Sequence, residues 1–275
     1  MQKASGPGPL RGRVAIVTGG SSGIGRAICM ELVGEGSAVV VVGRNAAHVG
    51  QVIADLDHAS GAVLGLTLDV GCEEDMEEMR QKTLERFGQI DILVAAAGVM
   101  RGTNTQRLLP YAAATMPIQE WDEVLKTNLR GVFLSNRAVI PTMIAQRRGW
   151  IINISSSRGG LYGNPYASAY CASKFGVIGL SESLADELCG YGVKVHVVLP
   201  DVVDTPILGK FGRSRLGQAL PPSRIAEFIV HLVTLPEEVI LLNPLIAPFL
   251  NLNRPIGLTK RVRQVGRITQ NDDRR

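Results

Sequence analysis

Short runs of apolar residues alternate with charged, amphipathic stretches along most of the chain. The apolar runs predict buried strands at Arg13–Thr18, Ala38–Gly43, Val63–Leu68, Ile90–Ala95, Trp150–Ile154 and Val193–Leu199, with a last strand at Val239–Leu242 that continues toward Ile246. Strands that are apolar at nearly every position are typical of a parallel sheet that is covered on both faces.

The stretches between these runs have the mixed polar and apolar character of surface helices. They predict helices at Gly25–Glu35, Asn45–Asp57, Glu73–Phe87, Glu120–Gln146 and Ala169–Cys189. Six or seven strands that alternate with helices indicate a Rossmann-like α/β fold, a doubly wound parallel sheet flanked by helices. No linker or internal repeat divides the pattern, so we expect a single domain over residues 1–254, followed by a tail over residues 255–275.

The composition is that of an ordinary globular protein, with 45% hydrophobic and 20% charged residues in a chain of 275. The formal net charge of +4 is too small to indicate a nucleic-acid partner. All of this charge resides in residues 255–275, where basic residues outnumber aspartates. We favour a solvated terminus for this basic tail over a segment that binds an anionic membrane surface.

The sequence gives no sign of a metal site or of a membrane segment. The four cysteines form no C-x-x-C pair and the four histidines show no ligand spacing. The N-terminus lacks the apolar core of a secretory signal, and the apolar run Val239–Leu252 is too short and too interrupted to span a bilayer. We therefore expect a cytoplasmic protein without membrane association.

A glycine-rich loop joins the first predicted strand to the first predicted helix. It reads Thr18-Gly19-Gly20-Ser21-Ser22-Gly23-Ile24-Gly25, a G-x-x-x-G-x-G spacing. Glycines in such a turn let backbone N–H groups approach a pyrophosphate at the helix N-terminus. The alternative is that the glycines only make a turn, but the place of this loop in an alternating α/β chain favours dinucleotide binding.

The end of the second strand bears on which dinucleotide binds. An acidic residue there would accept hydrogen bonds from the ribose of NAD. The chain instead has Gly43-Arg44-Asn45 and no carboxylate before Asp55. A guanidinium at this place can form charge-assisted hydrogen bonds with the 2′-phosphate of NADP. We expect NADP(H) rather than NAD(H); the alternative is that Arg44 only extends from a strand end into solvent.

A tyrosine and a lysine four residues apart lie at the start of the helix predicted from Ala169. Residues at this spacing share a helix face, so Lys174 can lie beside Tyr170. Unperturbed tyrosine has a pKa of about 10. A cation ~4 Å away, at an effective dielectric of ~20, contributes about 4 kcal/mol, which is close to three pKa units. Lys174, helped by the oxidised nicotinamide, would thus bring the pKa of Tyr170 toward the range that acid–base catalysis needs.

Together these features resemble the short-chain dehydrogenase/reductase family over about residues 10–250. The resemblance rests on the order and the distances of the glycine loop, Asn128, the strand end Asn153-Ile154-Ser155-Ser156-Ser157 and the pair Tyr170-x-x-x-Lys174. It implies that Tyr170 donates or accepts a proton and that Lys174 lowers the pKa of Tyr170 and holds the nicotinamide ribose. It also implies that a serine polarises the substrate oxygen and that Asn128 anchors a water of the proton relay.

The resemblance leaves two serines for the polarising role. Counted from the strand, the residue is Ser156; counted back from Tyr170 by the family's usual spacing, it is Ser157. We favour Ser156, because a strand end fixes a position more rigidly than the loop before a helix. Ser157 is then a structural hydroxyl.

Further cofactor contacts follow from the resemblance. Asp69 and Val70 resemble the pair that contacts the adenine, with a helix N-cap as the alternative for Asp69. Gly98 allows close approach of the cofactor, and Val203 and Thr205 resemble the residues that hold the nicotinamide carboxamide.

The chain departs from the family pattern at three places. The usual Asn-Asn-Ala-Gly reads Ala95-Ala96-Ala97-Gly98, so an asparagine hydrogen bond is missing, and the usual Pro-Gly after the sixth strand reads Pro200-Asp201. The segment Thr103–Pro117 makes the chain longer than usual beside the strand edge where ligands bind. We expect this segment either to line the substrate pocket or to be a surface excursion.

The sequence therefore predicts an NADP(H)-dependent oxidoreductase that moves a hydride between the cofactor and a small-molecule carbonyl or secondary alcohol, as in a ketone reductase. The resemblance also implies a homotetramer or homodimer built through the helices Glu120–Gln146 and Ala169–Cys189. The alternative is a cofactor-binding regulatory or scaffold protein on the same fold. The presence of both Tyr170 and Lys174 argues against this alternative.

Overall fold

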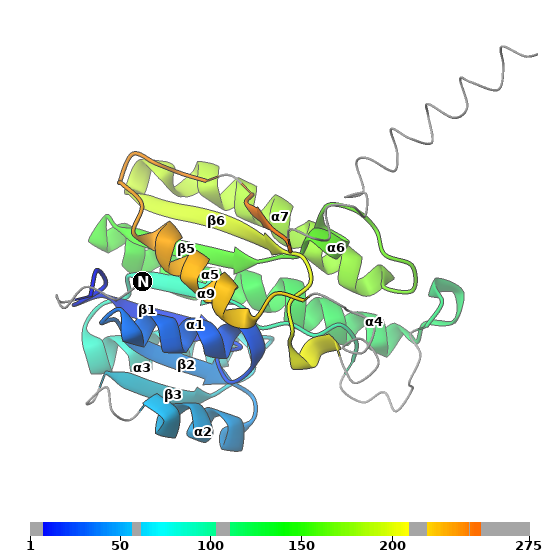
Figure 1. The fold of residues 1–275 in the computed structure, drawn as a ribbon, viewed down its shortest axis with the longest axis horizontal. Coiled ribbons are helices and arrows are strands. Elements are labelled where there is room, and N and C mark those ends of the chain that lie inside the picture. The colour runs from blue at the N-terminus through cyan, green and yellow to red at the C-terminus, as the bar shows by residue number, and fades with distance from the viewer. Residues whose placement is uncertain (1–7, 57–61, 103–110, 209–218, 242, 249–275) are drawn as a thin grey trace, which may run out of the picture.

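One parallel sheet organises the molecule (Figure 1). The computed structural model describes residues 8–56, 62–102, 111–208, 219–241 and 243–248. The strands are β1 (Val14–Thr18), β2 (Ala38–Gly43), β3 (Val63–Thr67), β4 (Ile92–Ala95), β5 (Gly149–Ile154), β6 (Val193–Pro200) and β7 (Leu245–Ile246). Their order across the sheet is β3-β2-β1-β4-β5-β6-β7, and all neighbours are parallel. The predicted doubly wound α/β fold is confirmed.

Helices cover both faces of this sheet (Figure 1). One face carries α1 (Gly23–Gly34), α2 (Ala46–Leu56) and α9 (Pro222–Val233), and the other carries α3 (Glu73–Phe87), α5 (Gly131–Gln146) and α7 (Ser168–Leu188). The shorter elements are α4 (Ile118–Leu125), the π turn η3 (Lys126–Arg130), α6 (Ser157–Gly160) and the 3-10 turns η2 (Ala113–Thr115), η4 (Cys189–Tyr191) and η5 (Pro206–Leu208). Among the described residues, no helix has the length and apolar character needed to cross a membrane.

The continuous apolar character of the strands follows from this layering. Successive side chains of a strand point to opposite faces. In β1, Ala15 and Val17 pack with the residues of α1, α2 and α9, whereas Ile16 packs with those of α3, α5 and α7. Strands β1 to β6 therefore supply side chains to both faces of the sheet, and a polar residue on either side would be buried.

The last strand is shorter and later than predicted. The pattern predicts a strand from Val239, but β7 comprises only Leu245 and Ile246. Side chains of β6 bind the backbone of the earlier segment: Lys194 Nζ donates to the carbonyl of Val239 at 3.3 Å, and His196 Nδ1 lies 3.2 Å from the carbonyl of Leu241. The carbonyls of this segment are thus bound by side chains. Apolar periodicity does not reveal such partners, so it misidentifies the segment as a strand.

The long helix predicted over Glu120–Gln146 is divided. It begins at Ile118 and passes through the π turn η3 before it continues as α5. The other predicted helices agree with the observed ones to within two residues. The basic tail over residues 255–275 lies outside the described residues, so the domain boundary stays a prediction.

A buried carboxylate joins three strands at the edge opposite the glycine loop. Asp91 directly precedes β4 and is fully buried. Its Oδ1 accepts hydrogen bonds from Arg13 at 3.2 Å and from Arg148 at 2.6 Å, and its Oδ2 accepts one from the backbone N–H of Val14 at 2.8 Å. Since Arg13 precedes β1 and Arg148 precedes β5, one side chain fixes the starts of β1, β4 and β5 relative to one another.

Replacing Asp91 should destabilise the protein. In Asp91→Ala the Val14 N–H loses its side-chain acceptor and two cations lose their partner, so the free energy of unfolding should fall by about 2–4 kcal/mol in urea titrations. The control is Glu227→Ala, which removes a surface pair with Arg224 on α9 and should change stability by less than about 1 kcal/mol. Equal losses in the two variants would contradict this role of Asp91.

Candidate active site

The glycine loop lies at the carboxyl end of β1, whose two neighbours β2 and β4 lead away on opposite sides. Ligands of open α/β sheets bind at such a switch point. Gly19 has φ +69°, and a Cβ there would lie 2.7 Å from the backbone of Ala97. A Cβ on Gly25 would overlap the carbonyl of Gly19, and Gly23 has φ +51°. These glycines form a cradle for a ligand, and larger residues at the three positions would fill this cradle or strain its backbone.

The first turn of α1 is arranged to accept an anion. Ser22 is the N-cap residue but makes no side-chain cap hydrogen bond, and the first turn carries no acidic residue. Gly20 fixes the loop, because its N–H donates to the carbonyl of Val42 at 3.0 Å. Ile24 is partly buried against the core. The N–H groups of this turn and the helix dipole thus fit the pyrophosphate of a dinucleotide.

The ends of β2 and β3 border the same loop. Gly43 closes β2 so near to Ser21 that a Cβ on the glycine would lie 2.5 Å from Ser21 Oγ. Arg44 follows with an exposed side chain. Burial raises the pKa of Asp69, but the Gly71 N–H, Lys126 and the charge of Arg44 lower it by more, so that this pKa stays below its usual value.

Asp69 does not cap a helix. Its carboxylate accepts hydrogen bonds from the N–H of Gly71 and from Lys126 Nζ, each at 3.0 Å, while the N-cap residue of α3 is Cys72. The helix-cap alternative for Asp69 is therefore wrong. Val70 is buried and packs in the core on the side of α3, α5 and α7.

Asn128 lies in the π turn and is fully buried. Its side chain accepts a hydrogen bond from the N–H of Val99 at 2.7 Å, donates to the carbonyl of Val99 at 2.8 Å and donates to Ser173 Oγ at 3.1 Å. A Cβ on Gly98 would lie 3.5 Å from Asn128 Oδ1 and 3.6 Å from Lys174 Nζ. Asn128 therefore joins the chain after β4 to α7, and Gly98 keeps the space beside Lys174 open.

Tyr170 and Lys174 are both buried on α7. Lys174 Nζ donates to the carbonyl of Ile154 at 2.8 Å and lies 5.8 Å from the centroid of the Tyr170 ring. Burial lowers the pKa of Lys174 to about 8, because the apolar surroundings disfavour the ammonium form.

The pKa of Tyr170 does not fall as the sequence predicts. Burial raises it, and a hydrogen bond with Ser156 opposes this effect without cancelling it. Lys174 by itself therefore does not lower the pKa of Tyr170 in this structure, and a lowering with the nicotinamide bound stays a prediction. The ammonium is bound to the Ile154 carbonyl on the strand side, so its main partner is a backbone oxygen.

The two candidate serines have different partners. Ser156 Oγ donates to the carbonyl of Arg158 at 3.0 Å and is the serine hydroxyl that opposes the rise in the pKa of Tyr170. Ser157 Oγ donates to Asp201 Oδ1 at 2.7 Å. The geometry favours Ser156 as the serine that acts beside Tyr170.

Val203 and Thr205 follow β6 and are buried. A Cβ on Gly23 would lie 3.3 Å from the methyl group of Thr205, so this segment lies directly against the glycine loop. The predicted cofactor residues after β1 and β6 thus come together on one side of the crevice.

A small pocket adjoins the Tyr170 ring. Its walls include Met100, Tyr111, Met116 and Val124, together with Tyr166 near the start of α7. Its volume of about 10 Å³ is room for about one water molecule. Tyr111 and Met116, from the long segment after β4, therefore line a pocket at Tyr170, while residues 103–110 lie outside the described residues.

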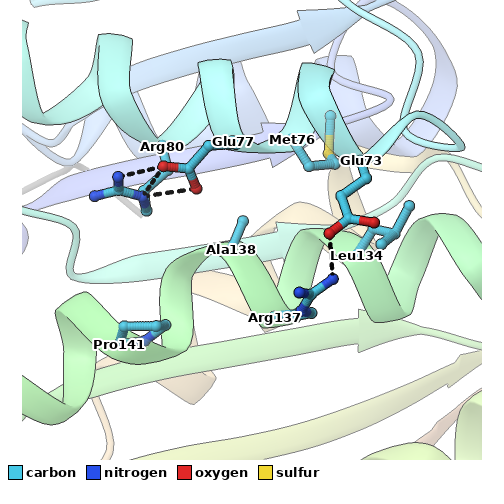
Figure 2. A pocket seen from close by; sticks show the side chains of 8 residues that line it. All are labelled: Glu73, Met76, Glu77, Arg80, Leu134, Arg137, Ala138 and Pro141. Carbon is cyan, nitrogen blue, oxygen red and sulfur yellow. Dashed lines mark hydrogen bonds and ion pairs between the residues drawn. The ribbon is translucent and has the colours of Figure 1, made fainter.

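A larger hollow of about 620 Å³ lies between α3 and α5 (Figure 2). Figure 2 shows two ion pairs at its walls, Glu73 with Arg137 across the two helices and Glu77 with Arg80 along α3. None of the predicted site residues lines it. Within the described part of the chain, no group of three or more His, Cys, Asp or Glu side chains could hold a metal ion.

Comparisons with known proteins identify the family of this chain. Residues 13–215 match the family model described as short chain dehydrogenase. The chain is 33% identical over 234 residues to the 3-oxoacyl-acyl-carrier-protein reductase FabG of Thermotoga maritima, covering 82% of this chain and 92% of the relative.

Two solved structures are similar in fold. The 3-ketoacyl-(acyl-carrier-protein) reductase of Brucella melitensis, complexed with NADH, has a TM-score of 0.78 at 28% identity and covers 86% of this chain and 98% of its own. A metagenomic short-chain oxidoreductase in complex with NADP has a TM-score of 0.74 at 32% identity and covers 87% and 98%. This chain belongs to the short-chain dehydrogenase family, and is therefore an oxidoreductase built to bind a nicotinamide cofactor.

Proposed function

We propose that the protein is an NADP(H)-dependent ketone reductase. The observation that carries the proposal is the meeting of Ser156, Tyr170 and Lys174 at the carboxyl edge of the sheet, beside the glycine cradle. A cofactor-binding scaffold would need the cradle but not a buried lysine beside a tyrosine and a serine.

The catalytic roles follow from the hydrogen-bonding capacity of these groups. When bound, the nicotinamide supplies a hydride to the carbonyl carbon of the substrate. The Ser156 hydroxyl can rotate from the Arg158 carbonyl and donate to the substrate oxygen, which stabilises the negative charge that develops there. The Tyr170 hydroxyl then transfers its proton to that oxygen, so that the ketone becomes an alcohol.

The raised pKa of Tyr170 favours the reductive direction. A phenol that remains protonated at neutral pH is ready to donate, whereas oxidation of an alcohol requires the phenolate as base. Lys174 holds the nicotinamide ribose, and Asn128 keeps Gly98 and Lys174 in place through Val99 and Ser173. The water that the family resemblance implies at Asn128 stays a prediction.

The preference for NADP(H) over NAD(H) rests on Arg44. The similar structures contain NADH in one case and NADP in the other, so family membership leaves the choice open. In this chain the residue after β2 is an exposed cation, and the next carboxylate along the chain, Asp55, is paired with Arg26 at 2.8 Å. The 2′-phosphate of NADP matches this charge.

We also propose a homodimer or homotetramer. Phe133 on α5 is 43% exposed and Phe175 on α7 is 46% exposed, and both helices belong to the region that the family resemblance assigns to assembly. Burial of these rings by a second copy would stabilise the assembly. The cytoplasmic location stays a prediction.

The first prediction concerns the cofactor. Arg44→Ala should weaken NADPH binding about 10- to 100-fold, because it removes charge-assisted hydrogen bonds to the 2′-phosphate, and should leave NADH binding nearly unchanged. Fluorescence titration of both cofactors measures this. The matched control is Arg137→Ala, which removes an exposed arginine of α5 outside the crevice. Equal weakening for NADPH and NADH would contradict the role of Arg44.

The second prediction concerns turnover. Screening ketones by NADPH consumption should find substrates that wild type reduces and that Tyr170→Phe does not, because phenylalanine has no proton to donate. Cofactor binding without reduction of any ketone would instead support the scaffold alternative.

The third prediction concerns the buried lysine. The lowered pKa of Lys174 corresponds to about 3 kcal/mol of unfavourable burial of the ammonium at neutral pH. Lys174→Met should lose activity but gain about 1–3 kcal/mol of unfolding free energy at pH 7, since the lost hydrogen bond to Ile154 offsets part of the gain. Between pH 8 and about 10 the unfolded wild type binds more protons than the folded form, so wild-type stability rises and the gain shrinks.

Urea unfolding at pH 7 and pH 10 checks this prediction. Lys82→Met, at an exposed position on α3, should change stability by less than about 0.5 kcal/mol at both pH values. A Lys174→Met variant that is less stable than wild type at pH 7 would show that the ammonium stabilises the fold.

The fourth prediction concerns the substrate pocket. Tyr111→Ala removes a wall of the pocket beside Tyr170 and should raise KM for the ketone several-fold with little change in KM for NADPH. Tyr191→Ala, at an exposed position in η4, is the control and should alter neither value. Unchanged ketone kinetics in Tyr111→Ala would show that the segment is a surface excursion.

A further inference from the structure

Asp201 stands directly after β6, where the family usually has a glycine. Its N–H donates to the carbonyl of Ile246 at 2.8 Å, so its backbone is fixed by β7. Its carboxylate is only 8% exposed and lies at the same sheet edge as the candidate active site. A buried carboxylate needs partners, and two side chains of the segment that follows β5 donate to it.

These donors are consecutive residues. Ser157 Oγ donates to Asp201 Oδ1 at 2.7 Å, and Arg158 Nε donates to the same oxygen at 3.0 Å. Both bonds are charge-assisted, and the low exposure of the carboxylate strengthens them relative to surface pairs. One oxygen of Asp201 thus binds the backbone segment directly after Ser156 through two side chains.

That segment cannot hold its own shape. α6 has only four residues, and two of them are not helical: Arg158 has φ −88° and ψ 98°, and Gly159 has φ 109° and ψ −5°. A single turn interrupted in this way gains little from helical hydrogen bonds. Its conformation therefore depends on contacts with other elements. The carboxylate of Asp201 provides a buried, charged contact of this kind.

The same segment contacts the reacting groups. The carbonyl of Arg158 accepts the hydrogen bond from Ser156 Oγ at 3.0 Å. A Cβ on Gly159 would lie 3.0 Å from two carbons of the Tyr170 ring, so the backbone of this segment lies against that ring. A shift of Arg158 and Gly159 would therefore move both the carbonyl that accepts the Ser156 hydrogen bond and the backbone against which the Tyr170 ring packs.

We propose that Asp201 is a positioning residue: by holding Ser157 and Arg158 it sets the orientation of the Ser156 hydroxyl relative to Tyr170. The catalytic part of this proposal rests on the proposed reductase function. It also gives Ser157 a role, as a link between Asp201 and the neighbouring serine. A glycine at position 201 has no side chain with which to make these contacts.

The test compares Asp201→Ala with Asp201→Asn. Alanine removes both hydrogen bonds, whereas asparagine keeps the volume and one acceptor oxygen and should restore part of the effect. Neither variant buries an unpaired cation, because the Arg158 side chain is 36% exposed and can be hydrated. Glu227→Ala breaks another arginine–carboxylate pair, on α9, and is the matched control.

The first readout needs no substrate. The chain has five tyrosines, so ¹³Cζ-labelled tyrosine gives few NMR signals, and the one lost in Tyr170→Phe belongs to Tyr170. We expect this signal to shift at pH 7 in Asp201→Ala and to lie nearer its wild-type position in Asp201→Asn. We also expect the pKa of Tyr170 to rise further in Asp201→Ala, because its hydrogen bond with Ser156 is loosened.

The second readout is ketone reduction. In Asp201→Ala, kcat should fall about 10- to 100-fold, because the serine and the tyrosine are misplaced relative to each other. KM for NADPH should stay within about twofold, because the Asp201 side chain binds Ser157 and Arg158 and its N–H binds the Ile246 carbonyl, all outside the glycine loop. A lower unfolding midpoint with an unchanged Tyr170 signal and unchanged kcat would overturn the proposal.

The two readouts separate this proposal from the proposed function. If wild type reduces no ketone but the Tyr170 signal still shifts in Asp201→Ala, the reductase function fails and the positioning by Asp201 stands. If wild type reduces ketones and Asp201→Ala changes neither kcat nor the Tyr170 signal, the function stands and Asp201 has no positioning role.

Discussion

The parallel register of β1, β4 and β5 is the constraint on which the site depends. Thr18 lies opposite Ala95, and Ala95 lies opposite Asn153, so the three strands end at one level. At the other end the buried carboxylate of Asp91 binds groups that precede or begin β1 and β5. The glycine loop, Gly98 and Ser156 follow these strands directly. A slip of one residue in this register would turn the strand side chains toward the wrong core and separate these groups.

Burial affects the two titratable groups of the site in the same sense. It lowers the pKa of Lys174 and raises that of Tyr170, so it favours the neutral form of each. The groups that oppose this effect are few and local: the carbonyl of Ile154 for the ammonium and the hydroxyl of Ser156 for the phenol. The acid–base behaviour of the site therefore depends on where single hydrogen-bonding atoms lie. The last residue of β5 supplies one of them, and the segment after β5 orients the other.

Much of the fold is predictable from the sequence because burial on two faces imposes a simple pattern. Continuous apolar runs identify β1 to β6 correctly, whereas β7 fails because side chains of Lys194 and His196 bind the carbonyls of the segment before it. The π turn at Asn128 leaves no mark in apolar periodicity, since it changes hydrogen bonding without changing which faces are apolar. Motif spacing predicts which residues gather at the site, but not how they are oriented.

Three-dimensional contacts decide how the side chains of the site residues are oriented. Spacing alone left Ser156 and Ser157 as alternatives, and the structure separates them by partner, Tyr170 for one and Asp201 for the other. In the same way, the electrostatic argument for a lowered Tyr170 pKa assumed a lysine about 4 Å from the hydroxyl, whereas the ammonium is directed at the backbone of β5.

The alanines after β4 illustrate how a departure from a family motif can be absorbed. Ala95 and Ala96 stand where the family pattern has asparagines, yet the chain there is held by its backbone. The N–H of Ala96 donates to the carbonyl of Thr18 at 3.1 Å, and the backbone of Ala97 lies against Gly19. Asn128 then binds both the N–H and the carbonyl of Val99. Backbone contacts and one amide from the π turn thus hold this edge without an asparagine side chain from the β4 loop, and the small alanine side chains leave the crevice open for the cofactor.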